Sequence, residues 1–354
     1  MRITPGYLPD PQTDYEAKAV AFCKAWLLGQ EFFTLQTSGS TGTPKPIVLS
    51  RRQMAASAHL TGQTFHLRPG DRALACLSVD YIAGVMMLVR GLELGLDLTV
   101  VEPVSNPLRS FDSQTDSFAL AAFVPLQVHT LLDHPEHSLP LLNTMRTILV
   151  GGAAVDPLLA SRLQILQAPV FSTYGMTETV SHVAIRRING PEQTEVFRTL
   201  AGVEIGVDDR SCLHIRAAAT DFARVQTNDV VDLVDASHFR LLGRADSMIN
   251  TGGVKIQPER VETIIAELVA REMPPARFFI AGLPDERLGQ QVVLFVEQAT
   301  WPTSFIEIIK QTIPEKLGTY ASPKKIITVP VFRETPTGKI DRKATVHEFL
   351  VQPI

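Results

Sequence analysis

Apolar residues recur at helical spacing in two early stretches of the chain. The first stretch lies between the capping pair Thr13 and Glu16 and a glycine at position 29, and its apolar positions are Tyr15, Ala19, Phe22, Cys23, Trp26 and Leu27. This spacing predicts an amphipathic helix. A second capping pair, Ser50 and Gln53, predicts a helix that runs toward Phe65 and ends before the turn at residues 68–71.

From residue 73 onward, short apolar runs alternate with helical patterns. The runs that read as strands are 73–79, 98–101, 121–124 and 147–150, and helices are expected at 82–94, from Gln127 and from Asp156. Such alternation is typical of an α/β domain with a mainly parallel sheet.

The pattern restarts after residue 246. Pro258 opens an amphipathic helix, and strand-like runs follow at 278–281 and 292–296. We therefore predict a large N-terminal domain, residues 1–245, and a small α+β lid, residues 246–354.

Composition narrows the function classes. The chain has 354 residues, 45% of them hydrophobic, and a net charge of -4, which gives no electrostatic case for binding nucleic acid or an anionic membrane. Cys23, Cys76 and Cys212 are scattered singly, which predicts reduced thiols rather than disulfides or a cysteine metal site. The start lacks a secretory signal and the longest apolar run, 82–89, is too short to span a bilayer, so we expect a soluble cytoplasmic protein. No histidine pair has the helical spacing of zinc ligands, and no zinc is expected.

One stretch combines hydroxyls, glycines and a lysine. It contains Thr37, Ser38, Gly39, Ser40, Thr41, Gly42, Thr43 and Lys45, and the strand-like run 46–49 follows it. Glycines let successive backbone N–H groups turn toward an anion, and the hydroxyls and the lysine add donors. The stretch therefore predicts a phosphate-binding loop, with a solvated surface loop as the alternative; it lacks the spacing of the common P-loop.

Two further stretches have residues suited to binding a nucleotide. The apolar run 147–150 ends in Gly151, Gly152 and Ala153, where a flat ligand could approach the backbone, or where the chain simply turns. The stretch 171–179 places Tyr174 and Gly175 before Thr177 and Glu178, so that a ring could stack on a base beside a hydroxyl and a carboxylate. Core packing of the tyrosine is the alternative.

Four motifs in order give the chain a family resemblance. They are 37–45, 174–179, 243–249 with 252–256, and 335–342, the last reading Thr-Pro-Thr-Gly-Lys-Ile-Asp-Arg. Together they resemble the core motifs of the acyl-adenylate-forming superfamily, which includes acyl-CoA and aryl-CoA synthetases, adenylation domains and luciferases. The resemblance implies a two-step ligase: a carboxylate attacks the α-phosphate of ATP to give acyl-AMP and pyrophosphate, and a thiol, usually that of coenzyme A, then takes the acyl group.

The resemblance also assigns roles by motif. Tyr174 would stack on adenine, Asp229 would bind the ribose hydroxyls, and Glu178 would hold Mg²⁺. The loop at 37–45, Thr177 and Arg244 would contact phosphates or ribose, and the pocket would be lined by Gly151, Gly152, Ala153, Ser172, Thr173 and Gly175. Asn228 stands where the family usually has glycine, a departure that asparagine tolerates where the backbone needs a positive φ.

The lid would act through a lysine and a hinge. Lys339 would bridge the substrate carboxylate and the α-phosphate during adenylation, with an ordinary surface lysine as the alternative. Asp246 would be the hinge on which the lid rotates, after which the loop of Gly252, Gly253 and Lys255 would replace Lys339 beside the thiol's tunnel. Asp246 as a solvated or capping residue is the alternative.

Two departures bear on the substrate. Only 36 residues precede the loop, against some 150 in the family as a rule, so we expect most of the first subdomain to be missing. Tyr81 stands in the place of a common histidine, and Arg90 follows inside the apolar helix, where a charge is costly unless it is paired or reaches solvent. Arg90 could instead take a second carboxylate of the substrate.

With Tyr81 and Arg90 as substrate-binding residues, the chain looks most like the o-succinylbenzoate–CoA ligases of menaquinone synthesis. Two alternatives remain open: another acyl-acid or aryl-acid ligase, or an adenylation enzyme that loads a carrier protein; and a nucleotide-binding homologue without turnover. The sequence predicts small-molecule partners only, namely an acid, ATP and coenzyme A, and gives no oligomeric state.

Overall fold

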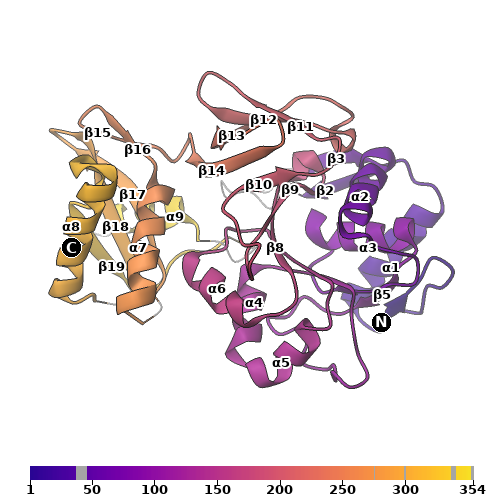
Figure 1. The fold of residues 1–354 in the computed structure, drawn as a ribbon. Helices are drawn as coiled ribbons and strands as arrows, with labels where there is room; N and C mark the ends of the chain where they lie inside the picture. The colour runs from indigo at the N-terminus through magenta and orange to yellow at the C-terminus, as the bar shows by residue number, and fades with distance from the viewer. Residues whose placement is uncertain (37–45, 275, 299, 336–339, 352–354) are drawn as a thin grey trace.

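The computed structural model of the chain describes residues 1–36, 46–274, 276–298, 300–335 and 340–351. These residues form one large mixed sheet, a smaller second sheet and a two-stranded hairpin (Figure 1). The structure is therefore α/β with a smaller α+β part at the C-terminal end, as predicted.

The large sheet has a parallel half and an antiparallel half. Its strands run, in spatial order, β1 (Arg2–Ile3), β5 (Asp97–Val100), β4 (Arg72–Ala75), β6 (Leu120–Phe123), β7 (Thr147–Val150), β8 (Val170–Gly175), β9 (His182–Arg187), β10 (Phe197–Thr199), β14 (His238–Arg244), β13 (Val225–Leu233), β12 (Cys212–Arg216) and β11 (Glu204–Val207). Strands β5, β4, β6, β7 and β8 are parallel, and each pairing from β8 to β11 is antiparallel. The alternation in the sequence predicted the parallel half but not the antiparallel half, so the sheet is mixed rather than mainly parallel.

Helices cover both faces of the parallel strands. They are α1 (Asp14–Leu27), α2 (Arg51–Phe65), α3 (Ile82–Leu94), α4 (Pro125–Asp133), α5 (Pro135–Leu142) and α6 (Pro157–Arg162), with short 3-10 helices at 163–165, 177–179 and 218–220. Along β4, Ala73 and Ala75 pack into the cluster under α1 to α3, whereas Leu74, and Cys76 directly after the strand, pack into the cluster under α4 to α6. This two-sided burial follows from the alternation of side chains in a strand.

The capping residues act largely as predicted. Thr13 accepts a hydrogen bond from the Glu16 N–H at 3.2 Å and begins α1, although the Glu16 carboxylate bonds the Gln12 N–H instead of closing the box. Ser50 and Gln53 form the complete box that begins α2. The hairpin of β2 (Phe32–Gln36) and β3 (Pro46–Ser50) flanks the predicted phosphate loop.

The second sheet forms the small C-terminal part. Its strands are β15 (Ile249–Thr251), β16 (Val254–Ile256), β17 (Phe278–Asp285), β18 (Gly289–Glu297) and β19 (Lys325–Val329), and its helices are α7 (Pro258–Glu272), α8 (Thr303–Leu317), a 3-10 helix at 319–321 and α9 (Arg342–Val351). Helix α7 packs against α6 and β14 of the large part. The predicted division at residues 245 and 246 falls in the segment between β14 and β15, and independent movement of the two parts stays a prediction.

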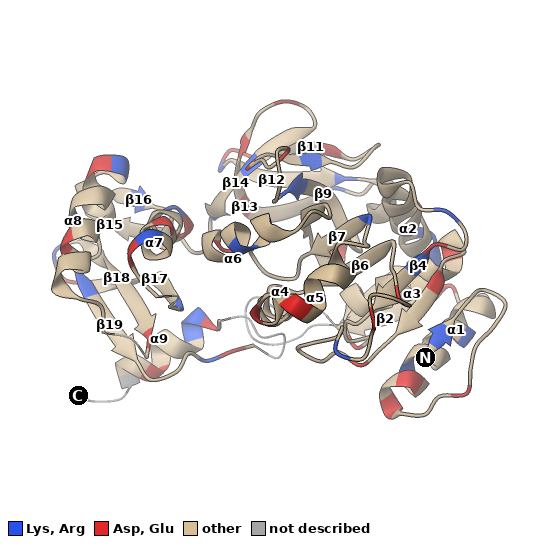
Figure 2. Cartoon of the chain, turned by 60° about the horizontal axis from the view of Figure 1, so that its bottom comes forward, with Lys and Arg blue, Asp and Glu red and all other residues tan. Residues whose placement is uncertain are grey.

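Charged residues of both signs are interspersed over both parts of the chain (Figure 2). None of the helices in the described residues is long and apolar enough to cross a membrane.

Candidate active site

Tyr174 lies near the carboxyl end of β8, where the parallel half of the sheet meets the antiparallel half. Its hydroxyl donates a hydrogen bond to Asp229 Oδ2 at 2.6 Å, and its ring packs edge-on against Phe239 with the centroids 5.2 Å apart. Burial of the ring, and then the neighbouring Asp229 carboxylate, raise the pKa of Tyr174. The phenol therefore stays protonated and acts as a donor that orients Asp229.

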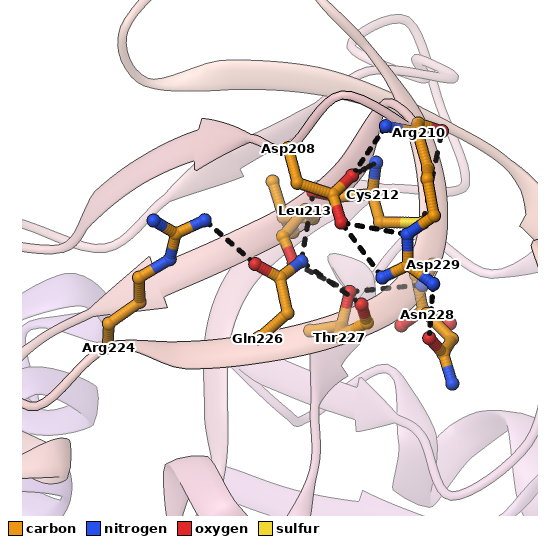
Figure 3. A network of polar contacts seen from close by, with 9 residues as sticks. All are labelled: Asp208, Arg210, Cys212, Leu213, Arg224, Gln226, Thr227, Asn228 and Asp229. Carbon is orange, nitrogen blue, oxygen red and sulfur yellow. Dashed lines mark hydrogen bonds and ion pairs between the residues drawn. The ribbon is translucent and has the colours of Figure 1, made fainter.

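The part of β13 that carries Asp229 is bonded to the neighbouring strand β12. Figure 3 shows Thr227 donating to the Leu213 carbonyl at 2.8 Å and accepting from the Asp229 N–H at 3.0 Å, while Asp208 pairs with Arg210 at 2.8 Å. With its backbone bonded to Thr227 and one oxygen bonded to Tyr174, Asp229 has a fixed direction. Its remaining lone pairs are acceptors suited to two ribose hydroxyls.

Arg244 connects Asp229 to the start of the small part. Its Nη1 lies 3.0 Å from Asp229 Oδ1, and its Nε and Nη2 lie 2.9 and 2.8 Å from the two oxygens of Asp246. The bidentate bond to Arg244 lowers the pKa of Asp246, and the bond to Asp246 raises the pKa of Arg244. Tyr174, Asp229, Arg244 and Asp246 thus form one continuous chain of polar contacts.

The glycines after β7 allow close packing at the sheet edge. A Cβ at Gly151 would come within 2.2 Å of Thr173 Oγ1, and Gly152 has a φ of +80°. Thr173 donates to the Val150 carbonyl at 3.3 Å, so the end of β7 is bonded to the middle of β8. Ser172 is buried and Ala153 exposed. That these residues line an adenine pocket stays a prediction.

Thr177 and Glu178 lie in a short 3-10 helix directly after β8. Thr177 is buried and Glu178 is exposed, and among the residues that the structure describes Glu178 makes no ion pair. Within the described ranges there is also no cluster of His, Cys, Asp and Glu that could enclose a metal. One free carboxylate suits Mg²⁺, which is commonly bound by one or two carboxylates together with substrate phosphates.

Arg90 is buried on α3 among apolar side chains, with only 3% of its surface exposed. Its Nε donates to Thr61 Oγ1 at 3.2 Å and its Nη2 to Ser181 Oγ at 2.6 Å, and Nη1 lies 3.6 Å from the Met87 sulfur. None of the ion pairs of the described residues includes Arg90, and the remaining residues of the sequence contain no Asp or Glu. The alternative of a side chain reaching solvent at the helix end does not describe this residue.

Burial acts on both basic groups of this cluster. It lowers the pKa of Arg90 to about 10, which leaves the guanidinium charged at neutral pH. Burial, and then the charge of Arg90, hold the pKa of His182 well below its ordinary 6.5, so the imidazole is neutral. The site is therefore a buried single positive charge among hydroxyls and a neutral ring, an arrangement that attracts an anion.

Sequence reasoning missed Thr61, Ser181 and His182. Ser181 and His182 directly follow the motif at 174–179, and this adjacency was the available signal. Thr61 comes from another helix and shows nothing in the sequence beyond a polar position. The hairpin β8–β9 brings the groups together, because it carries Tyr174 on one strand and Ser181 with His182 where the second strand begins.

The remaining predicted residues are more dispersed. Tyr81 precedes α3 and pairs with Gln36, which ends β2. Gly252 and Gly253, with φ values of +58° and +80°, form the turn of the β15–β16 hairpin, and Lys255 is exposed on β16. Lys339 and the loop residues 37–45 lie outside the described residues.

Comparison with known proteins identifies the family. Residues 30–214 match the family model described as "AMP-binding enzyme". The chain belongs to this AMP-binding family. A solved structure from Dyadobacter fermentans, described as an acyl-CoA synthetase (AMP-forming)/AMP-acid ligase II-like protein, is 43% identical, has a TM-score of 0.66, and aligns over 98% of this chain and 99% of that one.

Curated relatives within the family are more distant. A 2-succinylbenzoate–CoA ligase of Listeria monocytogenes is 26% identical over 94% of this chain and 72% of its own length. An oxalate–CoA ligase of Arabidopsis thaliana is 24% identical over 90% of this chain and 68% of its own length. The chain is thus an AMP-forming acid–thiol ligase of the AMP-binding family.

Proposed function

We propose that this AMP-binding enzyme is an o-succinylbenzoate–CoA ligase of menaquinone biosynthesis. It would activate the acid with ATP as an acyl-adenylate and transfer the acyl group to coenzyme A. The acid has two carboxylates: one reacts, and the other needs a binding group.

The observation that carries the proposal is Arg90. A buried charge without a counter-charge is destabilising, and Arg90 is 3% exposed with no ion pair among the described residues. A carboxylate of the substrate would supply the missing charge through a charge-assisted hydrogen bond. The names of the two relatives, a 2-succinylbenzoate and an oxalate ligase, both denote dicarboxylic acids.

The residues predicted to bind the nucleotide have the chemistry that the adenylation step requires. Asp229, aimed by Tyr174, would hold the ribose, and Thr177 with the loop at 37–45 would hold the phosphates. Glu178 would hold Mg²⁺, which when bound neutralises charge on the phosphates. Holding a weak carboxylate nucleophile in line with the α-phosphate is the main catalytic task, and Lys339 would neutralise the charge that develops.

The acceptor step would use the lid. Residues 246–354 would rotate about Asp246, so that Lys339 leaves and the Gly252–Gly253 turn with Lys255 faces the thiol. One site could then serve both half-reactions. The Arg244–Asp246 pair, at the junction of the two parts, is the contact that such a rotation would change.

Pyrophosphate exchange measured with a panel of acids tests the proposal. We expect exchange with 2-succinylbenzoate and much less with 4-oxo-4-phenylbutanoate, which lacks the ring carboxylate. Preference for oxalate or another acid would instead indicate one of the other acid ligases. Product analysis with coenzyme A and with a carrier protein identifies the acceptor of the acyl group. Absence of exchange with every acid would favour the alternative that the chain is a nucleotide-binding homologue without turnover.

A further inference from the structure

The chain makes an unusual turn at Val180, between the Thr177–Thr179 helix and β9. Val180 has φ of +67° and ψ of -54° and is fully buried. The Ser181 N–H donates to the Thr179 carbonyl at 2.8 Å, which closes a γ-turn around Val180. A β-branched residue in this region is strained and persists only where its surroundings hold it.

The surroundings hold this turn from both sides. Thr179 Oγ1 accepts from the Met176 N–H at 3.0 Å and lies 2.9 Å from the Ser181 carbonyl oxygen. A Cβ at Gly175 would come within 2.3 Å of that same oxygen, so the backbone of Ser181 passes directly over a glycine. The consequence is a fixed direction for the Ser181 side chain, toward Arg90.

Ser181 also differs from the other partners of Arg90. Thr61, Met87 and His182 are buried, whereas Ser181 is partly exposed. Among the described residues, Ser181 is therefore the partner of Arg90 that is not fully buried. A carboxylate that approaches Arg90 from solvent meets this hydroxyl.

The hydroxyl proton of Ser181 is available for such a ligand. Ser181 Oγ accepts from Arg90 at 2.6 Å, and its only described acceptor is the ring nitrogen Nδ1 of His182 at 3.4 Å, which is long for an O–H donor. A serine hydroxyl can accept one hydrogen bond while it donates another. Arg90 and Ser181 can thus donate to one carboxylate together.

From this geometry we propose that Ser181, aimed by the strained turn at Val180, is a specificity-determining residue that binds the second carboxylate of the acid jointly with Arg90. This inference rests on the proposed function, because it assumes a dicarboxylic substrate. The Ser181 hydroxyl would be a neutral hydrogen-bond donor beside Arg90. It would favour acids with a second carboxylate over acids that have a hydrogen or an alkyl group in its place.

Kinetics with matched acids test the role of Ser181. In pyrophosphate exchange, Ser181→Ala should raise the KM for 2-succinylbenzoate about tenfold, the effect of losing one hydrogen bond to a charged group. The KM for ATP and the kcat/KM for 4-oxo-4-phenylbutanoate should stay unchanged, and Ser181→Thr should restore most of the diacid affinity. An equal loss with both acids would show a structural role and overturn the assignment.

The rates of the wild type with the two acids distinguish failure of the Arg90 assignment from failure of the Ser181 assignment. If it uses the two acids equally well, or neither of them, the assignment of Arg90 fails and that of Ser181 fails with it. If the wild type prefers the diacid and Ser181→Ala keeps the full preference, only the assignment of Ser181 fails.

A pair of variants at Val180 tests the turn. Val180→Ala keeps a Cβ and hence the restriction on the backbone, whereas Val180→Gly frees it. We expect the glycine variant to raise the KM for the diacid several-fold more than the alanine variant, although its melting temperature should be no lower, because glycine adopts the positive φ without strain. Equal KM values in folded proteins would show that the turn does not position Ser181.

Discussion

Two arginines of this enzyme have opposite surroundings. Arg90 is buried, donates to two hydroxyls and lies against a thioether, whereas Arg244 is partly exposed and donates to two carboxylates. The single positive charge of Arg244 lies beside two carboxylates. One belongs to Asp229 on β13, and the other to Asp246 at the start of the small part. Arg90 has none among the described residues.

The difference shows how to distinguish a structural cation from a ligand-binding one. A guanidinium whose charge is balanced inside the protein holds elements together, and an exposed pair of this kind contributes little to stability. A buried guanidinium with only neutral partners lowers stability and is explained by a ligand. Arg90 fits the second description, and the contacts of Arg244 fit the first, while the contact of Arg244 with ribose or phosphate stays a prediction.

The largest expected effect concerns Lys339, which lies outside the described residues. Lys339→Ala should slow adenylation roughly 10² to 10³ fold for every acid, as for the loss of an electrostatic donor to a transition state. Pyrophosphate exchange measures this step. Thioester formation from synthetic acyl-AMP should be spared, and an equal loss in both half-reactions would refute the role.

Exchanging each arginine for methionine tests the comparison directly. Arg90→Met should reduce kcat/KM for the diacid about 100-fold, since a charged partner of the carboxylate is lost. It should also raise the free energy of unfolding by roughly 1 to 2 kcal/mol, because an unpaired buried charge becomes an apolar contact. Arg244→Met should lower it by less than about 1 kcal/mol. Denaturant titrations of both variants check the signs, and a destabilised Arg90→Met would contradict the comparison.

At the nucleotide end, Asp229→Asn should raise the KM for ATP about 10- to 100-fold, because hydrogen bonds to a carboxylate are worth roughly 1.5 to 3 kcal/mol. The KM for the acid should change little. Asp208→Asn is the matched control, since Asp208 bonds Arg210 in the same region but contacts neither Tyr174 nor Arg244. Similar KM values for ATP in both variants would argue against a ribose-binding role for Asp229.

The neutral state of His182 predicts a pH effect on stability. The pKa of His182 is lowered in the folded state, so on acidification the unfolded chain binds the proton first. Stability should fall below the ordinary pKa of about 6.5, and between pH 6.5 and 5.5 this histidine should account for a loss of about 1 kcal/mol. Thermal melts of the wild type and His182→Gln over this range measure the difference, and parallel curves would mean that the imidazole is not buried as a neutral group.

The smallest effect is expected at Asp246. Arg244 lowers the pKa of Asp246, so the stabilisation from this carboxylate is present above the ordinary pKa of about 3.9 and is lost as pH falls through the lower folded value. Asp246→Asn should therefore reduce stability by less than about 1 kcal/mol at pH 7. Rates of the two half-reactions check the hinge: thioester formation should slow more than adenylation.

Much of both parts was predictable because the signals are local. The capping pairs at Thr13 and Ser50, the buried run before Gly151 and the helix opened by Pro258 each depend on neighbouring residues, and the structure has these elements. Strand bounds were less accurate: the run 73–79 predicted a strand longer than β4, because its last residues are apolar for packing and not for pairing.

The contacts of the site were less predictable, because they join residues far apart in the chain. The bond of Tyr174 to Asp229 spans 55 positions and that of Arg90 to Ser181 spans 91. The positive φ of Val180 contradicts its local preference, since a β-branched residue predicts extended backbone. Only the arrangement of Gly175 and Thr179 around it explains the conformation.

The hairpin of β8 and β9 has one more consequence. Tyr174 and Ser181 are seven positions apart on a single hairpin, so under the proposed roles this hairpin would set the distance between the adenine and the second carboxylate of the acid. An acid of another length would then require changes on helix α3, which carries Arg90 and lies against Ser181. Redesign of chain-length selectivity should therefore begin with residues of that helix and leave the hairpin untouched.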